Sequence, residues 1–66
     1  MIHLYKSSDS GQHRNEIGTF KSIESAAEKV RELSRGNREN ESYNAIMERG
    51  YCMIGYGPDM YEIDDK

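Results

Sequence analysis

The side chains of this sequence best suited to metal chemistry are two histidines and one cysteine, His3, His13 and Cys52. Structural zinc sites use paired ligands at short spacings and need four of them in total. These three residues lie far apart in the chain and form no such pair. We therefore expect no metal ion and no other cofactor.

Nucleophilic catalysis needs a serine, threonine or cysteine held against a base, and a third group that orients the base. Cys52 lies two residues before Ile54 in an expected strand, where a small buried thiol is the usual outcome. The carboxylates of Glu62 and Asp64 lie near the end of the chain, where we expect them to be solvated. The sequence therefore predicts no catalytic residues and a protein that is not an enzyme.

A basic surface is one candidate for recognition. Its members would be Lys29, Arg31, Arg35 and Arg38. Phosphate binding depends on a concentrated positive patch, because the released counterions supply much of the free energy. Here glutamates alternate with the basic residues, and the whole chain carries a net charge of −3. We therefore rank a nucleic-acid-associated regulator below a protein-binding function.

An unusual number of tyrosines and methionines supports the protein-binding alternative. The chain has five tyrosines and four methionines, and tyrosine is enriched at protein interfaces. The predicted partner-binding residues combine these with acidic neighbours: Tyr43, Tyr51, Met53, Tyr56, Tyr61, Glu62 and Asp64. The alternative is that two or three of these tyrosines close the edge of a small core, and the sequence leaves both open.

Three segments at the start of the chain have clear patterns. Residues 2–6 alternate, with Ile2 and Leu4 on one face, and residues 16–20 read as a second strand that pairs with the first. A helix over 23–35 follows, since Ser22 can cap its first turn and its apolar residues share one stripe. That stripe consists of Ile23, Ala26, Ala27, Val30 and Leu33.

The rest of the chain is ambiguous around residues 42–47. We expect a three-stranded meander over 42–47, 51–56 and 60–64, with turns at 48–50 and 57–59. A short second helix that ends at Gly50 is the alternative. The resulting fold class is α+β in the order ββαβββ, with one helix on one face of a small antiparallel sheet. The inner face would contain Ile2, Leu4, Ile17 or Phe20, Ile46 and Ile54.

The length of 66 residues predicts a single domain over 1–66 with a small core, since only 35% of the residues are hydrophobic. Self-association as a homodimer or docking on a larger partner would add stability. One cysteine fits a reducing compartment. The first residues contain no signal-peptide pattern, and no apolar run could cross a membrane. We therefore expect a cytoplasmic protein.

The organisation of the whole chain resembles the small inhibitor proteins encoded by bacteriophages, including anti-CRISPR and anti-restriction proteins. The features that carry the resemblance are a short strand pair, the helix after Ser22, and C-terminal strands that end in Asp64-Asp65-Lys66. The resemblance implies a non-enzymatic protein that covers the working surface of a larger host protein, such as a defence nuclease complex, inside the host cytoplasm. It carries no motif that assigns roles to individual residues.

Overall fold

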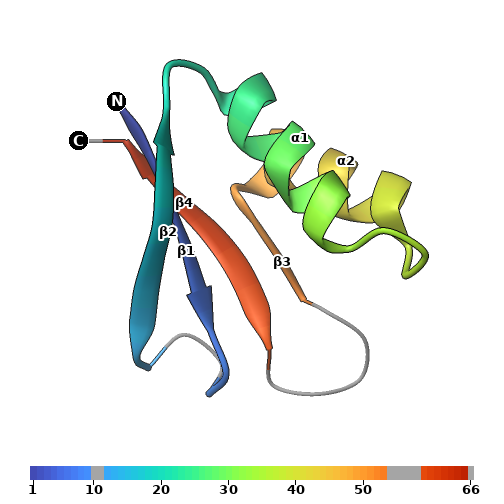
Figure 1. Ribbon diagram of the computed structural model, residues 1–66, viewed down its shortest axis with the longest axis horizontal. Helices are drawn as coiled ribbons and strands as arrows, with labels where there is room; N and C mark the ends of the chain where they lie inside the picture. Colours follow the sequence, from blue (N-terminus) through green and yellow to red (C-terminus); the bar gives the residue numbers. More distant parts are fainter. Residues whose placement is uncertain (10–11, 54–58, 66) are drawn as a thin grey trace.

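The computed structural model describes residues 1–9, 12–53 and 59–65. Its elements, in chain order, are β1 (Ile2–Ser7), β2 (Arg14–Phe20), α1 (Ile23–Leu33), α2 (Glu39–Arg49), β3 (Tyr51–Met53) and β4 (Met60–Asp65), as Figure 1 shows. The strands form one antiparallel sheet in the order β2-β1-β4-β3. The α+β class is confirmed. The expected order ββαβββ is wrong, since the observed order is ββααββ.

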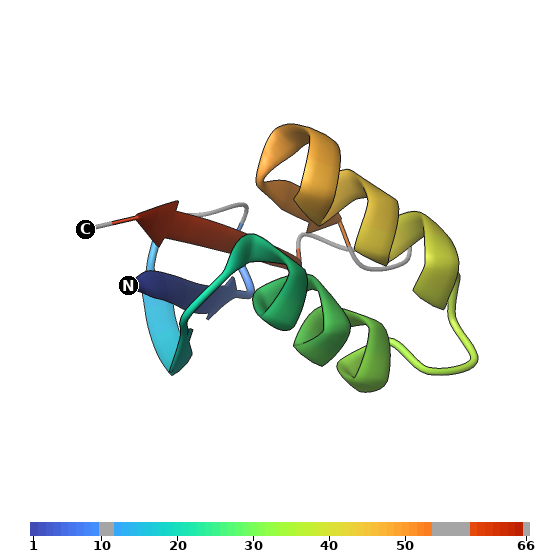
Figure 2. The ribbon, with the colours of Figure 1, turned by 90° about the horizontal axis from the view of Figure 1, so that it is seen from above.

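The sheet is built around β1, which pairs with β2 on one side and with β4 on the other. The pairing of β1 with β4 brings the two ends of the chain together, with the amino group of Met1 3.8 Å from the carboxylate of Asp65 (Figure 1). Both helices lie on the same side of the sheet, so the fold has two layers (Figure 2). None of the described helices is long and apolar enough to cross a membrane.

Helix α1 begins as the sequence predicts. The hydroxyl of Ser22 accepts a hydrogen bond of 3.2 Å from the backbone N–H of Ser25, which satisfies one unpaired amide of the first turn. The helix ends at Leu33, two residues before the predicted end, and the Ser34 hydroxyl then donates a 2.7 Å hydrogen bond to the carbonyl of Val30. Its buried residues are Ala26, Ala27 and Val30, whereas Ile23 and Leu33 at the two ends of the stripe are exposed.

The strand expected over 42–47 is wrong, because these residues belong to helix α2. Ser42, Ala45 and Ile46 are buried, and their spacing places them on one face of a helix. Gly50 has a φ of 83° and donates its N–H to the carbonyls of Ala45 and Ile46, which ends α2. The turn expected at 48–50 is therefore the last part of α2 and its cap. The second-helix alternative is the one that the structure adopts.

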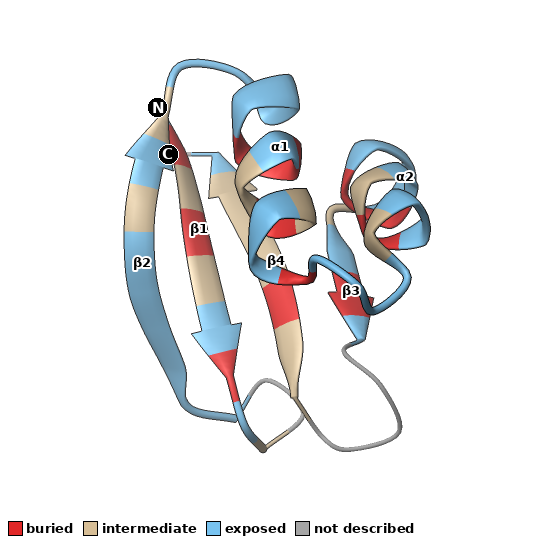
Figure 3. Cartoon of the chain, turned by 45° about the vertical axis from the view of Figure 1, so that its right-hand side comes forward, coloured by how far each residue is buried: buried red, intermediate tan, exposed pale blue. Residues whose placement is uncertain are grey.

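The core lies between the sheet and the helices, as the burial colours in Figure 3 show. Leu4, Val30 and Ile46 are its largest fully buried side chains. The other buried members of the cluster are Ala27, Ala45, Cys52 and Tyr61. The small alanines on both helices let the helix backbones approach each other and the sheet closely.

Most of the expected inner-face residues are confirmed. Ile2, Leu4 and Ile46 are buried, and Phe20 packs partly buried against the core. Ile17 is 39% exposed, because a β-bulge shifts the β1–β2 register between Leu4 and its neighbour Tyr5 and displaces Ile17 from the inner face. Ile54 and the turn expected at 57–59 lie wholly or partly outside the described residues, and β3 is described only to Met53.

Candidate functional site

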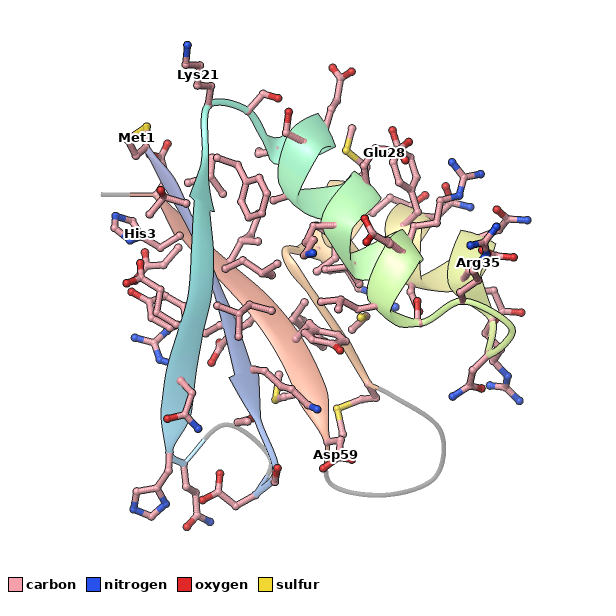
Figure 4. All side chains as sticks on the ribbon, viewed as in Figure 1. Met1, His3, Lys21, Glu28, Arg35 and Asp59 are labelled. Carbon is pink, nitrogen blue, oxygen red and sulfur yellow. The ribbon has the colours of Figure 1, made fainter. Side chains whose placement is uncertain are left out.

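The side of the sheet that faces away from both helices, here called the outer face, carries the most organised set of polar and aromatic side chains. Because Leu4 points into the core, the alternation of β1 places His3 and Tyr5 on this side. The strand registers then define the full set: His3, Tyr5, Arg14, Glu16, Tyr51, Met53, Met60, Glu62 and Asp64. Figure 4 shows the side chain of His3 pointing away from the helices.

A stack of rings and charges at the centre of the outer face joins three strands. The guanidinium of Arg14 lies 4.3 Å from the centroid of the Tyr5 ring, a cation–π contact. The ring of His3 stacks on Tyr5 at a centroid distance of 6.3 Å. Carboxylates hold both partners, since Arg14 Nε lies 3.6 Å from Glu62 Oε1 and His3 Nδ1 is hydrogen-bonded to Glu16. The stack therefore has a defined geometry before any partner arrives.

Strand β3 extends this surface to the edge of the sheet. The register places Tyr51 beside Glu62 and Met53 beside Met60. Tyr51 is 42% exposed and Met53 is 48% exposed, which is high for large apolar side chains. The guanidinium of Arg49 lies 5.5 Å from the centroid of the Tyr51 ring. The outer face therefore combines a charged centre with an apolar end.

The outer face is acidic. Its charged side chains are the carboxylates of Glu16, Glu62 and Asp64 and the single guanidinium of Arg14, which gives a net charge of −2 with His3 neutral. Opposite charge on a partner speeds association and disfavours wrong partners. The complementary partner surface is therefore basic.

The structure brings four of the seven predicted partner-binding residues together on the outer face: Tyr51, Met53, Glu62 and Asp64. Tyr43 lies on α2 in the other layer, with the guanidinium of Arg31 5.1 Å from its ring centroid. Tyr61 is 5% exposed and belongs to the core, so its side chain is not a surface anchor. Tyr56 lies outside the described residues.

Sequence reasoning missed His3, Tyr5 and Arg14 as members of this site. The signal was present in part, because the alternation of residues 2–6 already placed His3 and Tyr5 opposite the core side chains. What it lacked was the pairing of β1 with β4, a contact between the two ends of the chain that brings Glu62 beside Tyr5. Local pattern carries no information about such a pairing.

The four residues of the alternative phosphate-contact surface lie on α1 and in the segment after it. They are Lys29, Arg31, Arg35 and Arg38. Three of them have a carboxylate oxygen within 4.0 Å, supplied by Glu32, Glu28 and Glu41 respectively. Arg31 also donates a 2.8 Å hydrogen bond to Asn40 and so links the two helices. This arrangement offers phosphates little concentrated positive charge.

The reactive side chains are held apart. Cys52 is 3% exposed on the inner face of the sheet, whereas His3 lies on the outer face. His13 contacts the carboxylate of Asp9, whose pKa is lowered by hydrogen bonds from the backbone and ring of His13. Within the described residues, no three histidine, cysteine, aspartate or glutamate side chains gather as a metal site would require.

Two buried acids make the stability of the fold sensitive to alkaline pH. Burial raises the pKa of the Cys52 thiol above its usual value of 9.0, although the hydroxyl of Ser42, the backbone of Tyr61 and the charge of Arg49 oppose the shift. Burial likewise raises the pKa of the Tyr61 phenol above 10.0, and the charges of Cys52 and Asp59 add to the shift. Each group therefore ionises more readily in the unfolded chain than in the folded one.

We expect the free energy of unfolding to decrease as the pH rises above about 9. The contribution of a raised pKa is fully present below the unfolded value and is lost as the pH rises through the folded value. Urea unfolding from neutral pH to about pH 10 measures the decrease. The Cys52→Ala variant should show a smaller decrease than the unchanged chain. An equal decrease in both would mean that Cys52 does not contribute.

No protein-family model, curated protein or solved structure matches this chain. The functional argument therefore rests on the geometry and charge of the outer face.

Proposed function

We propose that the protein is a non-catalytic binding module that docks its outer face on a basic surface of a larger protein. The observation that carries the proposal is the stack of His3, Tyr5 and Arg14, which is held in place by Glu16 and Glu62 on the side of the sheet away from both helices. Tyrosine and arginine are the residue types most often found as binding anchors.

The contacts within the stack reduce the cost of binding. Ordering a long side chain at an interface costs roughly 0.5–1.5 kcal/mol. In this stack the Arg14 guanidinium is already placed by Tyr5 and Glu62, so most of that cost is met on folding. The exposed side chains of Tyr51 and Met53 add apolar area next to the charged centre.

The expectation that the partner is a host protein and that the chain is a phage-encoded inhibitor remains a prediction. Its support is the likeness in overall organisation together with the acidic outer face, which suits a basic surface of the kind that binds nucleic acid. A structural homodimer also stays a prediction, and the mass of the protein in solution tests it.

The proposal is tested with the partner itself. Affinity purification from host cells followed by mass spectrometry should recover one stoichiometric protein, which is then purified and titrated against variants of the chain. We expect Tyr5→Ala to weaken its binding by about 2 kcal/mol or more, which is roughly 30-fold in the dissociation constant. Binding should also weaken as the salt concentration rises, because it relies on opposite charges.

The matched control is Leu33→Ala, which truncates a side chain that is 44% exposed on the helix layer. This variant should bind the partner as tightly as the unchanged chain. The proposal fails if no stoichiometric protein is recovered, or if Tyr5→Ala and Leu33→Ala have equal effects on affinity. Thermal unfolding of both variants checks that each is folded at the temperature of the titration.

A further inference from the structure

A second surface lies at the edge of the sheet, where a groove of about 340 Å³ runs between α2 and β3. The two elements are joined directly at Gly50, so they run back alongside each other. This groove, here called the β3 groove, is defined by six of its lining residues: Asn37, Arg38, Ser42, Arg49, Tyr51 and Met53. It lies apart from the stack at the centre of the outer face.

One wall of the β3 groove is the outward edge of a strand. Strand β3 is the last in the sheet order, so β4 occupies one of its two edges and no described strand pairs with the other. The N–H of Ile63 donates a 2.9 Å hydrogen bond to the carbonyl of Gly50. Hydrogen-bonded and non-hydrogen-bonded pairs alternate in antiparallel sheets, so Tyr51 and Met53 direct their N–H and C=O groups away from β4 and into the groove.

The charge of the β3 groove is opposite to that of the outer face. Arg38 precedes the first residue of α2 and Arg49 is its last residue, so the two guanidiniums mark the two ends of the groove. The Arg38 guanidinium lies 4.0 Å from a carboxylate oxygen of Glu41. Within the described part of the chain, no carboxylate lies within 4 Å of the guanidinium of Arg49. The groove is therefore a positive site on a chain whose net charge is −3.

The dimensions of the groove fit an extended peptide. Helix α2 has 11 residues and is about 16 Å long at a rise of about 1.5 Å per residue. A strand of about five residues spans the same length. The opposite edge of the sheet suits such a ligand less well, because the bulge in the β1–β2 pairing makes β2 irregular.

We propose that the β3 groove binds an extended acidic segment of a partner protein, which adds to the sheet as a strand next to β3. The backbone groups of Tyr51 and Met53 hydrogen-bond to the added strand, and Arg38 and Arg49 bind its carboxylates. Backbone hydrogen bonds supply affinity in strand addition, and side-chain contacts supply specificity. This inference is independent of the proposed function, because it uses a different surface and a ligand of the opposite charge.

The test uses two labelled hexapeptides of the same design, in one of which valine alternates with glutamate and in the other with lysine. Each is titrated into the 15N-labelled chain and followed both by amide chemical shifts and by fluorescence anisotropy. We expect the glutamate peptide to shift the amides of Tyr51 and Met53 and to bind at least about tenfold more tightly than the lysine peptide. The amides of His3 and Tyr5 should not move.

Variants separate the backbone and charge contributions. Met53→Pro removes an N–H that β4 does not use, so it should reduce binding of the glutamate peptide at least about tenfold, whereas Met53→Ala keeps the N–H and most of the affinity. Arg49→Gln should weaken binding several-fold. Arg35→Gln is the control, because it removes a charge outside the groove.

The inference is overturned if neither peptide shifts Tyr51 and Met53 at millimolar concentration, or if both peptides bind equally. It is also overturned if Met53→Pro, folded by the criterion of its amide spectrum, binds the glutamate peptide like the unchanged chain. A mass that rises with protein concentration, with shifts in the groove but no peptide binding, would assign the groove to a second copy of the chain instead.

Discussion

Replacing Tyr61 with alanine is expected to lower the free energy of unfolding by about 3–5 kcal/mol, the usual cost of truncating a large buried aromatic side chain. Tyr61 is 5% exposed and packs in the core with Leu4 and Cys52. A domain of this length has a total stability of about 3–10 kcal/mol, so the variant is expected to be partly or wholly unfolded at 25 °C. Urea unfolding followed by circular dichroism measures the change.

Two matched variants make this prediction specific to burial. Tyr61→Phe keeps the ring and should cost less than about 1 kcal/mol. Tyr51→Ala removes the same atoms from a side chain that is 42% exposed and should also cost about 1 kcal/mol or less. If Tyr51→Ala destabilises the chain more than Tyr61→Ala does, the two tyrosines have been assigned to the wrong sides of the sheet.

Ile46→Ala is the second substitution with a large expected effect, a decrease of about 2–5 kcal/mol in the free energy of unfolding. Ile46 is 1% exposed and is the largest side chain that α2 contributes to the core. Its truncation leaves a cavity next to Leu4 and Val30, which the helices can fill only by moving closer to the sheet. Denaturant unfolding of the purified variant measures the loss.

The adjacent residue provides the control for this variant. Met47 is 40% exposed, so Met47→Ala should change the free energy of unfolding by less than about 1 kcal/mol. A helix over Glu39–Arg49 buries the consecutive residues Ala45 and Ile46, which a half-buried strand does not do. Equal losses for Ile46→Ala and Met47→Ala would contradict the packing of α2 described above.

Together, the outer face and the β3 groove give the molecule two surfaces of opposite charge. The outer face carries three carboxylates and one guanidinium, and the β3 groove carries Arg38 and Arg49 beside Glu41. The two proposals can therefore fail separately: Tyr5→Ala tests the outer face, while Met53→Pro and Arg49→Gln test the groove. A variant that changes one surface is expected to leave binding at the other unchanged.

Local signals in the sequence were sufficient for the first half of the fold. The alternation of residues 2–6 predicts β1, and the cap at Ser22 with the apolar stripe behind it predicts α1. These patterns are complete within one element, since each depends on neighbours along the chain. The same local logic explains why the end of α1 was placed within two residues of its observed position.

The second half was decided by contacts between segments far apart in the sequence. Residues 42–47 have a pattern that suits a helix or a strand, and packing against α1, together with the left-handed Gly50 cap, selects the helix.

Composition alone determined that the chain is a small acidic α+β domain rich in tyrosine. Which tyrosines are buried was fixed by the pairing of β4 with β1 and β3, which turns Tyr61 inward and Glu62 outward. A shift of one residue in that register would exchange the two faces, and a sequence pattern with period two cannot distinguish the two registers.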